Sequence, residues 1–446
     1  MKKIRFIALL TALCLLAVLF TACKRGDEAC GGLVALPSGT QTGGEEPSGG
    51  TGKPDETVDP TPLAVIDLTA EVSYTEEWPT LSPDAGFCDR QMDFSVELFR
   101  NAAQKSRCKN TLIAPVSVTM ALSMAANGAD GKTADEMLSV LGGFTVDELN
   151  SYLGNWWVGL KNDERSTLHM ANSIWIRNVE GFEAKEAFLA NNAKYYRAKV
   201  FKAPFNQIGV QKINEWVDQN TDGMIEQLVE EIRPETMMLL INVLAFDAEW
   251  NEPYQDHQVH KENFTTLDGK KQTVNMMYST ESRYLEGEGA VGFLRPYAGG
   301  KYSFGVLLPE EGTFEEYVDN LTGEQLSSIL ENEQSTVVRA RLPQFSNEYS
   351  IDLNDTLKEM GMPSAFLGGF GKMSNEDLFI GEVLHKSVIE VTQSGTRAAA
   401  VTSVAMDKST SPMVEPKTVT LDRPFIYFIL DNETNLPIFM GTVTSI

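Results

Sequence analysis

The chain has 446 residues, of which 42% are hydrophobic and 22% charged, and its formal net charge is −25 at pH 7. Such a strongly negative protein repels phosphate groups, so the charge argues against nucleic-acid binding and against electrostatic attraction to anionic membranes. Four histidines and five cysteines are too few for a metal-rich protein or for a scaffold built on disulfides. We therefore expect a globular protein that needs no cofactor and no metal.

The N-terminus has the features of an export signal. Basic residues precede an apolar run at residues 6–20, which is short for a helix that must span a bilayer with about 20 residues. Thr21, Ala22 and Cys23 follow the run directly and resemble a bacterial lipobox, in which the cysteine is acylated and becomes the new N-terminus. We expect residues 1–22 to be removed and Cys23 to carry a lipid. The alternative is an ordinary signal peptide followed by an incidental cysteine.

A change of composition separates this signal from the folded part of the chain. Residues 23–83 are rich in Gly, Thr, Glu and Pro and cannot bury a core, so we predict a flexible tether. The remaining residues, 84–446, are enough for one large domain with a substantial core.

Helical and strand patterns follow one another in this domain without regular alternation. Phe94 and Leu98 share one face of a helix predicted at residues 93–107, and an apolar helix is predicted at residues 117–127. The continuous apolar run at residues 237–246 suits a buried central strand. Further strands are predicted at residues 110–115, 169–177, 291–295, 303–308, 336–342, 388–391 and 425–430, and an amphipathic helix at residues 212–220. This mixture favours an α+β fold over a doubly wound sheet.

Two cysteines flank the first predicted helix. Cys88 and Cys108 could form a disulfide in an oxidising compartment. The helix at residues 93–107 is about 22 Å long at 1.5 Å per residue, so Cys88 would have to fold back along it to reach Cys108. We therefore expect both thiols to be free.

One glycine-rich pattern suggests nucleotide binding but is better explained as structure. Gly131, Lys132 and Thr133 end like a phosphate-binding loop, yet Ala126 stands where that motif needs a glycine, and a helix precedes it. Thr133 and Glu136 have the spacing of a capping box and are predicted to start the next helix.

The histidines do not form a convincing catalytic or metal site. His257 and His260 have a spacing that two metal ligands could use, but their polar neighbours favour a solvated loop. His385 lies between apolar residues and is predicted to be a hydrogen-bonded core histidine rather than a base. The chain lacks the motifs of zinc proteases, α/β-hydrolases and thiol oxidoreductases, so we do not expect an enzyme.

Residues 393–404 follow a predicted strand but contain almost no bulky side chain. In an extended conformation, where side chains alternate, one face would carry only small uncharged residues, namely Thr396, Ala398, Ala400, Thr402 and Val404. Arg397, the only charged residue of the segment, would lie on the opposite face. The segment could therefore enter a packed sheet without burying a charge. A short surface helix is the alternative, because alanine also favours helix.

Several segments match one protein family in the same order along the chain. They cover residues 110–117, 213–225, 242–250, 383–386, 419–429 and 438–443, the fifth of which contains Leu421-Asp422-Arg423-Pro424-Phe425. From about residue 93 to residue 446 the chain resembles the serpins, the superfamily of serine-protease inhibitors. The resemblance implies an α+β serpin fold with three β-sheets, about nine helices and an exposed reactive loop.

The resemblance also implies a mechanism. In the family, a target protease cleaves the reactive loop and forms an acyl-enzyme, and the freed loop then inserts into the main sheet and distorts the protease. The pattern at residues 393–404 meets the physical requirement of that step. We expect a monomeric suicide-type inhibitor of a serine protease, or of a cysteine protease. A non-inhibitory serpin that serves as a surface binding module is the alternative.

Family roles transfer to the positions that match its motifs. The hinge that enters the sheet first corresponds to Gly395, Thr396, Ala398, Ala399, Ala400 and Thr402. A polar cluster beneath the point where the sheet opens corresponds to Ser117, Asn242 and His385, and a buried residue near the top of the sheet corresponds to Trp250. The family's usual paired glutamates before the hinge are replaced here by Gln393 and Ser394, and Arg397 replaces another glutamate.

The family spacing also predicts the bond that the protease cleaves. Counted from Gln393, it is the bond between Ser409 and Thr410, with the bond between Lys408 and Ser409 as second choice. Counting back from Pro424 gives Met413 instead. Lys408 would attract proteases whose specificity pocket carries a carboxylate.

The predicted export signal and the predicted inhibitor domain together imply a cellular location. Export followed by lipid attachment at Cys23 would place the inhibitor in a bacterial cell envelope. Lys24 directly after the cysteine suits an outer-membrane or cell-surface lipoprotein, by analogy with Gram-negative bacteria. The expected partners are a target protease and, through the lipid, a membrane.

Overall fold

The computed structural model describes residues 64–73, 81–106, 109–160, 165–396 and 415–446. These residues belong to one unit of the chain, Thr57–Ile446, and the other unit, Met1–Glu56, lies outside them. The predicted signal peptide, Cys23 and Cys108 lie outside the described residues. So do the residues predicted to be cleaved, Lys408, Ser409 and Thr410.

A seven-stranded sheet forms the centre of the domain, with the strand order β1-β4-β3-β5-β13-β12-β11. Its strands are β1 Ile66–Asp67, β3 Ser166–Arg177, β4 Lys199–Ala203, β5 Met238–Glu249, β11 Phe345–Asp352, β12 Glu382–Val391 and β13 Gly395–Thr396. The apolar run predicted as a central strand is β5, which is buried at nearly every position. β5 and β12 run parallel, and the short β13 lies antiparallel between their ends.

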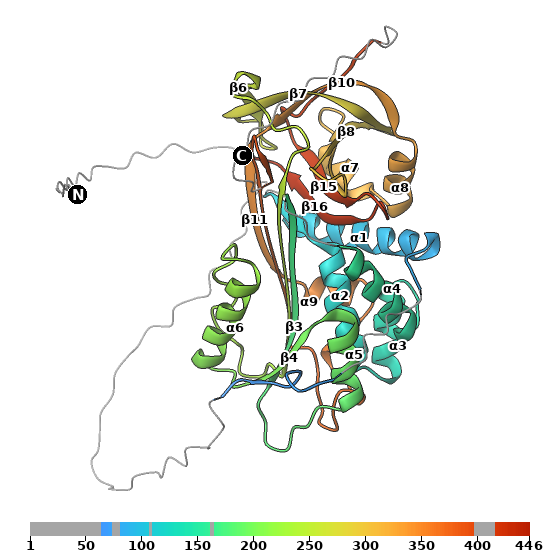
Figure 1. Cartoon of the computed structure of the whole chain (residues 1–446), viewed down its shortest axis with the longest axis vertical. Helices are drawn as coiled ribbons and strands as arrows, with labels where there is room; N and C mark the ends of the chain where they lie inside the picture. Colours follow the sequence, from blue (N-terminus) through green and yellow to red (C-terminus); the bar gives the residue numbers. More distant parts are fainter. Residues whose placement is uncertain (1–63, 74–80, 107–108, 161–164, 397–414) are drawn as a thin grey trace, which may run out of the picture. The chain divides into compact units, whose positions relative to one another are not determined.

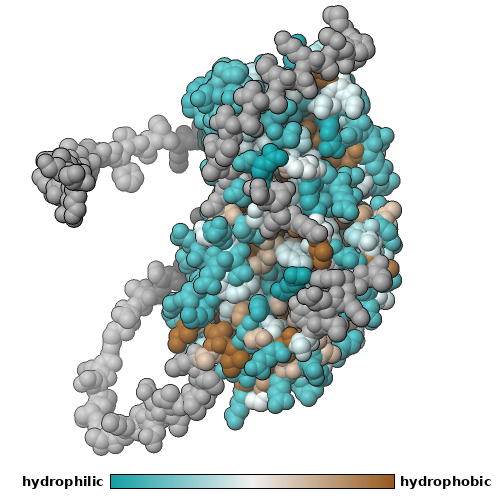
Figure 2. Space-filling view, viewed as in Figure 1, coloured by the Kyte–Doolittle hydropathy of each residue, from teal (hydrophilic) through white to brown (hydrophobic). Residues whose placement is uncertain are grey.

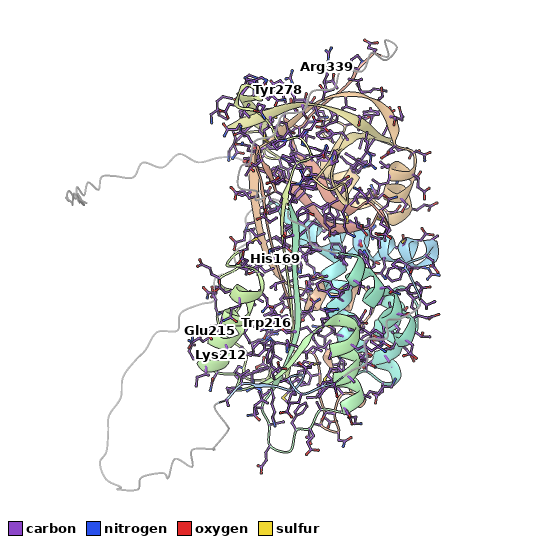
Figure 3. All side chains as sticks on the ribbon, in the orientation of Figure 1. His169, Lys212, Glu215, Trp216, Tyr278 and Arg339 are labelled. Carbon is purple, nitrogen blue, oxygen red and sulfur yellow. The ribbon has the colours of Figure 1, made fainter. Side chains whose placement is uncertain are left out.

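Helices cover both faces of this sheet, which explains why β5 is apolar on both sides. Figure 1 shows α6 (Gln207–Asn220) on one side of β3 and β4, with α2 (Pro115–Ala126) on the other. Every residue of α2 is buried, whereas α6 buries one face and places Trp216 edge-on against Trp175 and Phe201 of the sheet. Figure 3 shows Trp216 on α6 beside Lys212 and Glu215, which form an exposed ion pair at 2.6 Å.

A nine-stranded second sheet follows the order β14-β10-β7-β8-β9-β15-β16-β2, with β6 paired to β7. Its strands are β2 Thr111–Ile113, β6 Val259–Thr265, β7 Lys271–Gly287, β8 Ala290–Pro296, β9 Tyr302–Pro309, β10 Gln334–Pro343, β14 Lys417–Thr420, β15 Phe425–Asp431 and β16 Pro437–Val443. The long β7 pairs with β6 and β10 along most of its length and with β8 at its end. The second and third sheets of the expected serpin fold are therefore continuous here through β7.

The described residues contain nine α-helices, in agreement with the predicted α+β fold. Besides α2 and α6 they are α1 Ala85–Lys105, α3 Gly131–Val140, α4 Val146–Gly159, α5 Glu186–Tyr196, α7 Phe314–Asn320, α8 Gly323–Glu331 and α9 Asn354–Glu359, with two short 3₁₀ helices, η1 Asp256–Gln258 and η2 Pro363–Phe366. None of the helices in this part of the chain combines the length and hydropathy needed to cross a membrane.

Two predicted helix starts are wrong. The helix predicted at residues 93–107 begins earlier, at Ala85, because the Asp84 carboxylate accepts a hydrogen bond from the Phe87 amide and caps it. Cys88 therefore lies in the first turn of α1, as a free thiol whose pKa is raised by burial to about 11.

The predicted capping box of Thr133 and Glu136 does not start α3. That helix begins at Gly131, and both side chains make tertiary contacts instead. The Thr133 hydroxyl donates to the Gly368 carbonyl at 2.8 Å, and the Glu136 carboxylate accepts from the Ser364 amide at 2.8 Å. The same spacing thus serves to attach α3 to η2 and the turn after it.

Part of the predicted tether is folded. Residues 64–73 fall within the predicted tether at 23–83, yet they contain β1, which pairs with β4 at the edge of the seven-stranded sheet. The Asp67 carboxylate accepts hydrogen bonds from the Thr69 amide and the Lys199 ammonium, both at 2.9 Å. A few apolar residues and the free backbone donors and acceptors at the edge of β4 are enough to order this stretch. The polar composition around it had predicted a flexible tether.

The surface agrees with the strongly charged composition. Figure 2 shows mostly hydrophilic residues on one face of the molecule, with small hydrophobic areas. Among the described residues, the large hydrophobic side chains that are exposed are Ile66, Leu81, Ile208, Val337, Leu367 and Ile446. They are scattered along the sequence, as is normal for a folded protein.

Candidate functional site: the hinge and the seam of the sheet

The candidate site lies where β13 enters the seven-stranded sheet between β5 and β12. Gly395 pairs with Glu249 and Thr396 with Ala248 on β5, while Thr396 also pairs with Val391 on β12. These are the first two residues of the predicted hinge. Its remaining members, Ala398, Ala399, Ala400 and Thr402, lie outside the described residues.

Below β13 the two neighbouring strands pair with each other directly. We call this contact the seam; it runs from Leu239 opposite Glu382 to Ala245 opposite Val388. Above the seam the strands are separated by β13. The sheet is therefore open for one extra strand at its top and closed below.

A turn at residues 392–395, the hinge turn, connects β12 to β13 and is held by main-chain hydrogen bonds. The Thr392 amide and hydroxyl donate to the Gly395 carbonyl at 2.8 and 3.0 Å. The Trp250 indole donates to the Thr392 carbonyl, the Trp250 amide to the Ser394 carbonyl, and the Tyr254 amide to the Gln393 carbonyl, each at 2.9 Å. Trp250 and Tyr254 thus satisfy three successive carbonyls of the turn.

Gly395 is required at its position by the close approach of β5. A Cβ atom on this residue would lie 2.0 Å from the Ala248 carbonyl oxygen and 2.8 Å from the Glu249 Cα. No other residue fits there without moving β13 away from β5.

Thr396 faces the core and is fully buried. Its hydroxyl lies 2.5 Å from the hydroxyl of Tyr297, whose ring stacks on Trp250 with 4.6 Å between ring centroids. Burial raises the pKa of Tyr297, so its hydroxyl stays protonated and can serve this hydrogen bond. Tyr297 could not be predicted from the sequence, because nothing in the residues around it indicates a contact 99 positions away.

A polar cluster lies across the seam below β13. Asn242 on β5 is opposite His385 on β12, and the Asn242 carbonyl oxygen lies 2.6 Å from Nδ1 of His385. The Asn242 amide group donates to the Ser117 hydroxyl of α2 and to the Asn172 carbonyl oxygen of β3. The structure therefore brings together the three residues predicted for the cluster and adds Asn172, which the sequence did not reveal.

The remaining contacts of His385 determine its protonation state. Its Nε2 accepts a hydrogen bond from the Ala114 amide at 3.1 Å and lies 2.9 Å from the Ser387 hydroxyl. A backbone amide can only donate, so Nε2 is unprotonated, and the proton is on Nδ1, from which it is donated to Asn242. Burial lowers the pKa of His385 to about 3, so the ring is neutral. The prediction of a hydrogen-bonded core histidine is confirmed.

His169 lies on β3 opposite Ala245 of β5, beside the seam, and the two histidines considered as metal ligands lie on other elements. His257 is in η1 and His260 is exposed on β6, where its ring meets Tyr278 edge-on at 4.8 Å; Figure 3 shows Tyr278 near the end of the molecule that carries β7 and β10. Among the described residues, no three His, Cys, Asp or Glu side chains are grouped so that they could hold a metal ion. Lys132 of the rejected phosphate loop pairs with Glu136 of the same helix at 3.1 Å.

Comparison with protein families agrees with the geometry of the hinge and the seam. Residues 89–446 match the family described as Serpin (serine protease inhibitor). An uncharacterized serpin-like protein of Thermococcus kodakarensis is 34% identical over 360 residues, which cover 78% of this chain and 83% of that protein. Alpha-1-antiproteinase 2 of Equus caballus is 28% identical, with 79% of this chain and 85% of the relative covered.

Solved structures show the same fold. The crystal structure of tengpin, a thermophilic serpin, in the native state matches with a TM-score of 0.80 and 43% identity, covering 86% of this chain and 100% of that one. Tengpin in the latent state matches with a TM-score of 0.72 and 44% identity, covering 82% and 99%. The described fold is thus more similar to the native state of that serpin.

The neutral, buried His385 predicts a specific pH dependence of stability. In the unfolded chain the imidazole takes up a proton near its ordinary pKa of 6.5, but in the folded protein only near pH 3. The free energy of unfolding should therefore fall as the pH drops from about 6.5 towards 3, by up to about 1.4 kcal/mol per pH unit. Urea unfolding of the wild type and of His385→Gln between pH 4 and 7 measures this contribution. In the variant, the free energy of unfolding should change less steeply with pH, by about the contribution of one proton. Equal pH dependences of the two proteins would contradict the assignment.

Proposed function

Since the chain belongs to the serpin family of protease inhibitors, we propose that it traps a serine protease by inserting its cleaved reactive loop between β5 and β12. The observation that carries this proposal is β13, which already occupies the top of that position with Gly395 and Thr396. Insertion of a serpin loop into a sheet is a known form of strand addition and of strain release.

The register of β13 supports the proposed path. Thr396 lies opposite Ala248 and Val391, so the same antiparallel register continued by six residues would bring position 402 opposite both Asn242 and His385. Insertion would then separate Asn242 from His385. The hydroxyl of Thr402 can donate and accept, so it could replace the hydrogen bond that is lost.

The exchange of backbone pairing favours insertion. Opening the seam breaks seven residue pairs between β5 and β12, from Glu382 to Val388. Each inserted residue would pair with β5 on one side and with β12 on the other. The direct pairing of β5 with β12 would thus be replaced by two sets of backbone hydrogen bonds. The small uncharged face predicted for residues 396–404 could be covered by α2 without burying a charge.

We propose that the chain is a lipid-anchored protein of a bacterial envelope, most simply an outer-membrane or surface lipoprotein. The pattern of residues 1–23 supports export and acylation of Cys23, and the polar composition up to residue 63 suits a spacer. Expression of the full chain in a Gram-negative host should give a detergent-phase, membrane-associated protein, and Cys23→Ala should release it in the soluble phase. Equal partitioning of both proteins would contradict the lipid anchor.

The inhibitory mechanism is tested by mixing the chain with a panel of serine and cysteine proteases. We expect an SDS-stable complex with at least one of them, because the acyl-enzyme should be trapped before it hydrolyses. Mass spectrometry of the C-terminal fragment released on cleavage locates the bond, and we expect the fragment to begin at Thr410 or Ser409. A fragment that begins at Val414 would favour the count from Pro424. Simple cleavage by every protease, without a complex, would favour a non-inhibitory binding module.

A charge at Thr396 should separate cleavage from inhibition. Thr396 is already fully buried against Tyr297 in β13, so in Thr396→Arg the variant must either bury an unpaired guanidinium or keep β13 out of the sheet, before cleavage as well as after it. We expect the variant to be cleaved at the wild-type rate but to form little or no complex. Thr418→Arg, an exposed position on β14, is the matched control and should inhibit normally. Unchanged inhibition by Thr396→Arg would mean that the loop does not insert along this path.

A further inference from the structure

A buried ion pair contacts residues 250–254, the segment that donates hydrogen bonds to the hinge turn. Arg295 of β8 and Glu281 of β7 are in hydrogen-bond contact, and only 6% of each side chain is exposed. The Ser279 hydroxyl also donates to the Glu281 carboxylate at 2.5 Å and lies 3.4 Å from the hydroxyl of Tyr254. We refer to Arg295 and Glu281 as the brace.

The brace contacts the segment that holds the hinge turn at three points. The guanidinium carbon of Arg295 lies 5.0 Å from the centre of the Trp250 ring and 4.0 Å from that of the Tyr254 ring. Between these two residues, the Glu252 carbonyl accepts a hydrogen bond from the same guanidinium. Arg295 thus fixes both ends and the middle of residues 250–254.

The same segment supplies the donors that keep the hinge turn in place. The amides of Trp250 and Tyr254 and the Trp250 indole donate to the three carbonyls of residues 392–394. Trp250 also stacks on Tyr297, which contacts the Thr396 hydroxyl. Arg295 is therefore connected to the backbone of the hinge turn through one residue, Trp250 or Tyr254, and to the side chain of Thr396 through two, Trp250 and Tyr297.

Stability alone does not account for such a pair. The cost of removing two charges from water offsets most of their mutual attraction, and an apolar pair of similar size commonly serves a folded core as well or better. A planar guanidinium, however, can stack on two rings and donate to a carbonyl and a carboxylate in fixed directions, which an apolar side chain cannot do. The pair is therefore better explained by the geometry that it imposes.

We propose that Arg295 and Glu281 are positioning residues that keep the hinge turn seated in the sheet, so that the cleaved loop starts to insert before the protease is released. The effect on inhibition rests on the proposed function, whereas the effect on the hinge turn does not. Weakening the brace leaves the reactive bond untouched. It therefore changes how the cleaved intermediate divides between trapped complex and free protease, and not how fast it forms.

The test compares the full chain with the double variant Arg295→Met/Glu281→Met, which replaces both charged side chains by unbranched apolar ones. Hydrogen exchange is measured at the amides of Trp250, Tyr254 and Thr396. In the same preparations, the moles of inhibitor consumed per mole of protease inhibited are measured. We expect faster exchange at these amides and a roughly fivefold rise in inhibitor consumed, equivalent to about 1 kcal/mol at 1.4 kcal/mol per tenfold. The rate of the first cleavage should not change.

Two further variants make the outcome decisive. Arg283→Met/Glu333→Met removes another ion pair that begins on β7 but joins it to residue 333 instead of to residues 250–254, and it should change neither readout. Arg295→Lys keeps the charge but loses the planar fork, so it should show a smaller shift in the same direction, and it decides the question if the double variant does not fold. Wild-type exchange and consumption in a folded brace variant would overturn the proposal. If the wild type itself forms no complex, the proposed function fails, and the exchange data still decide the role of the brace.

Discussion

The contact between β5 and β12 is the constraint on which the rest of this structure depends. Main-chain hydrogen bonds between two strands can be exchanged for hydrogen bonds to a third strand without changing their number on either neighbour, so a sheet can open wherever something replaces the lost pairing. Here the seam is closed from Leu239 to Ala245 and opened above by β13. The seam residues of β5 and the alternate residues of β12 that include His385 and Ser387 are buried, which limits what can enter to a strand whose inward side chains are small.

Different interactions hold the strands above the seam and in its middle. At the top, Gly395 lets β13 approach β5, and the donors of Trp250 and Tyr254 hold the turn that precedes it. In the middle of the seam, the backbone pairing is supported by the bond between Asn242 and His385. The top contacts can persist when a longer strand forms, whereas the bond between Asn242 and His385 has to break. Insertion that starts at the hinge therefore keeps the contacts of the hinge turn. It has to break the bond between Asn242 and His385 only after the first inserted residues have paired with β5 and β12.

Much of the fold and part of the site could be predicted from the sequence, because they depend on local patterns and motifs. The apolar run of β5 and the small residues after Gly395 are such patterns. Trp250 and His385 were identified through family motifs. Asn172, Tyr297 and Arg295 were missed, because their roles depend on partners that are distant in sequence, such as Thr396 for Tyr297. The same applies to β1, which is fixed by an edge of β4 more than 130 residues away, and to Thr133, whose capping spacing was used for a tertiary contact.

The chemistry of the polar cluster explains how a seam can be both specific and able to open. Every member of the cluster is neutral: Ser117, Asn172, Asn242 and the singly protonated His385. Separating neutral partners inside a protein costs far less than separating ions, because no charge is left without a counter-charge in a medium of low dielectric constant. Burial lowers the His385 pKa to about 3, so this neutrality holds at pH values well above 3. The charged brace, by contrast, lies on β7 and β8, outside the seam. Arg295 and Glu281 therefore do not have to be separated when a strand enters between β5 and β12.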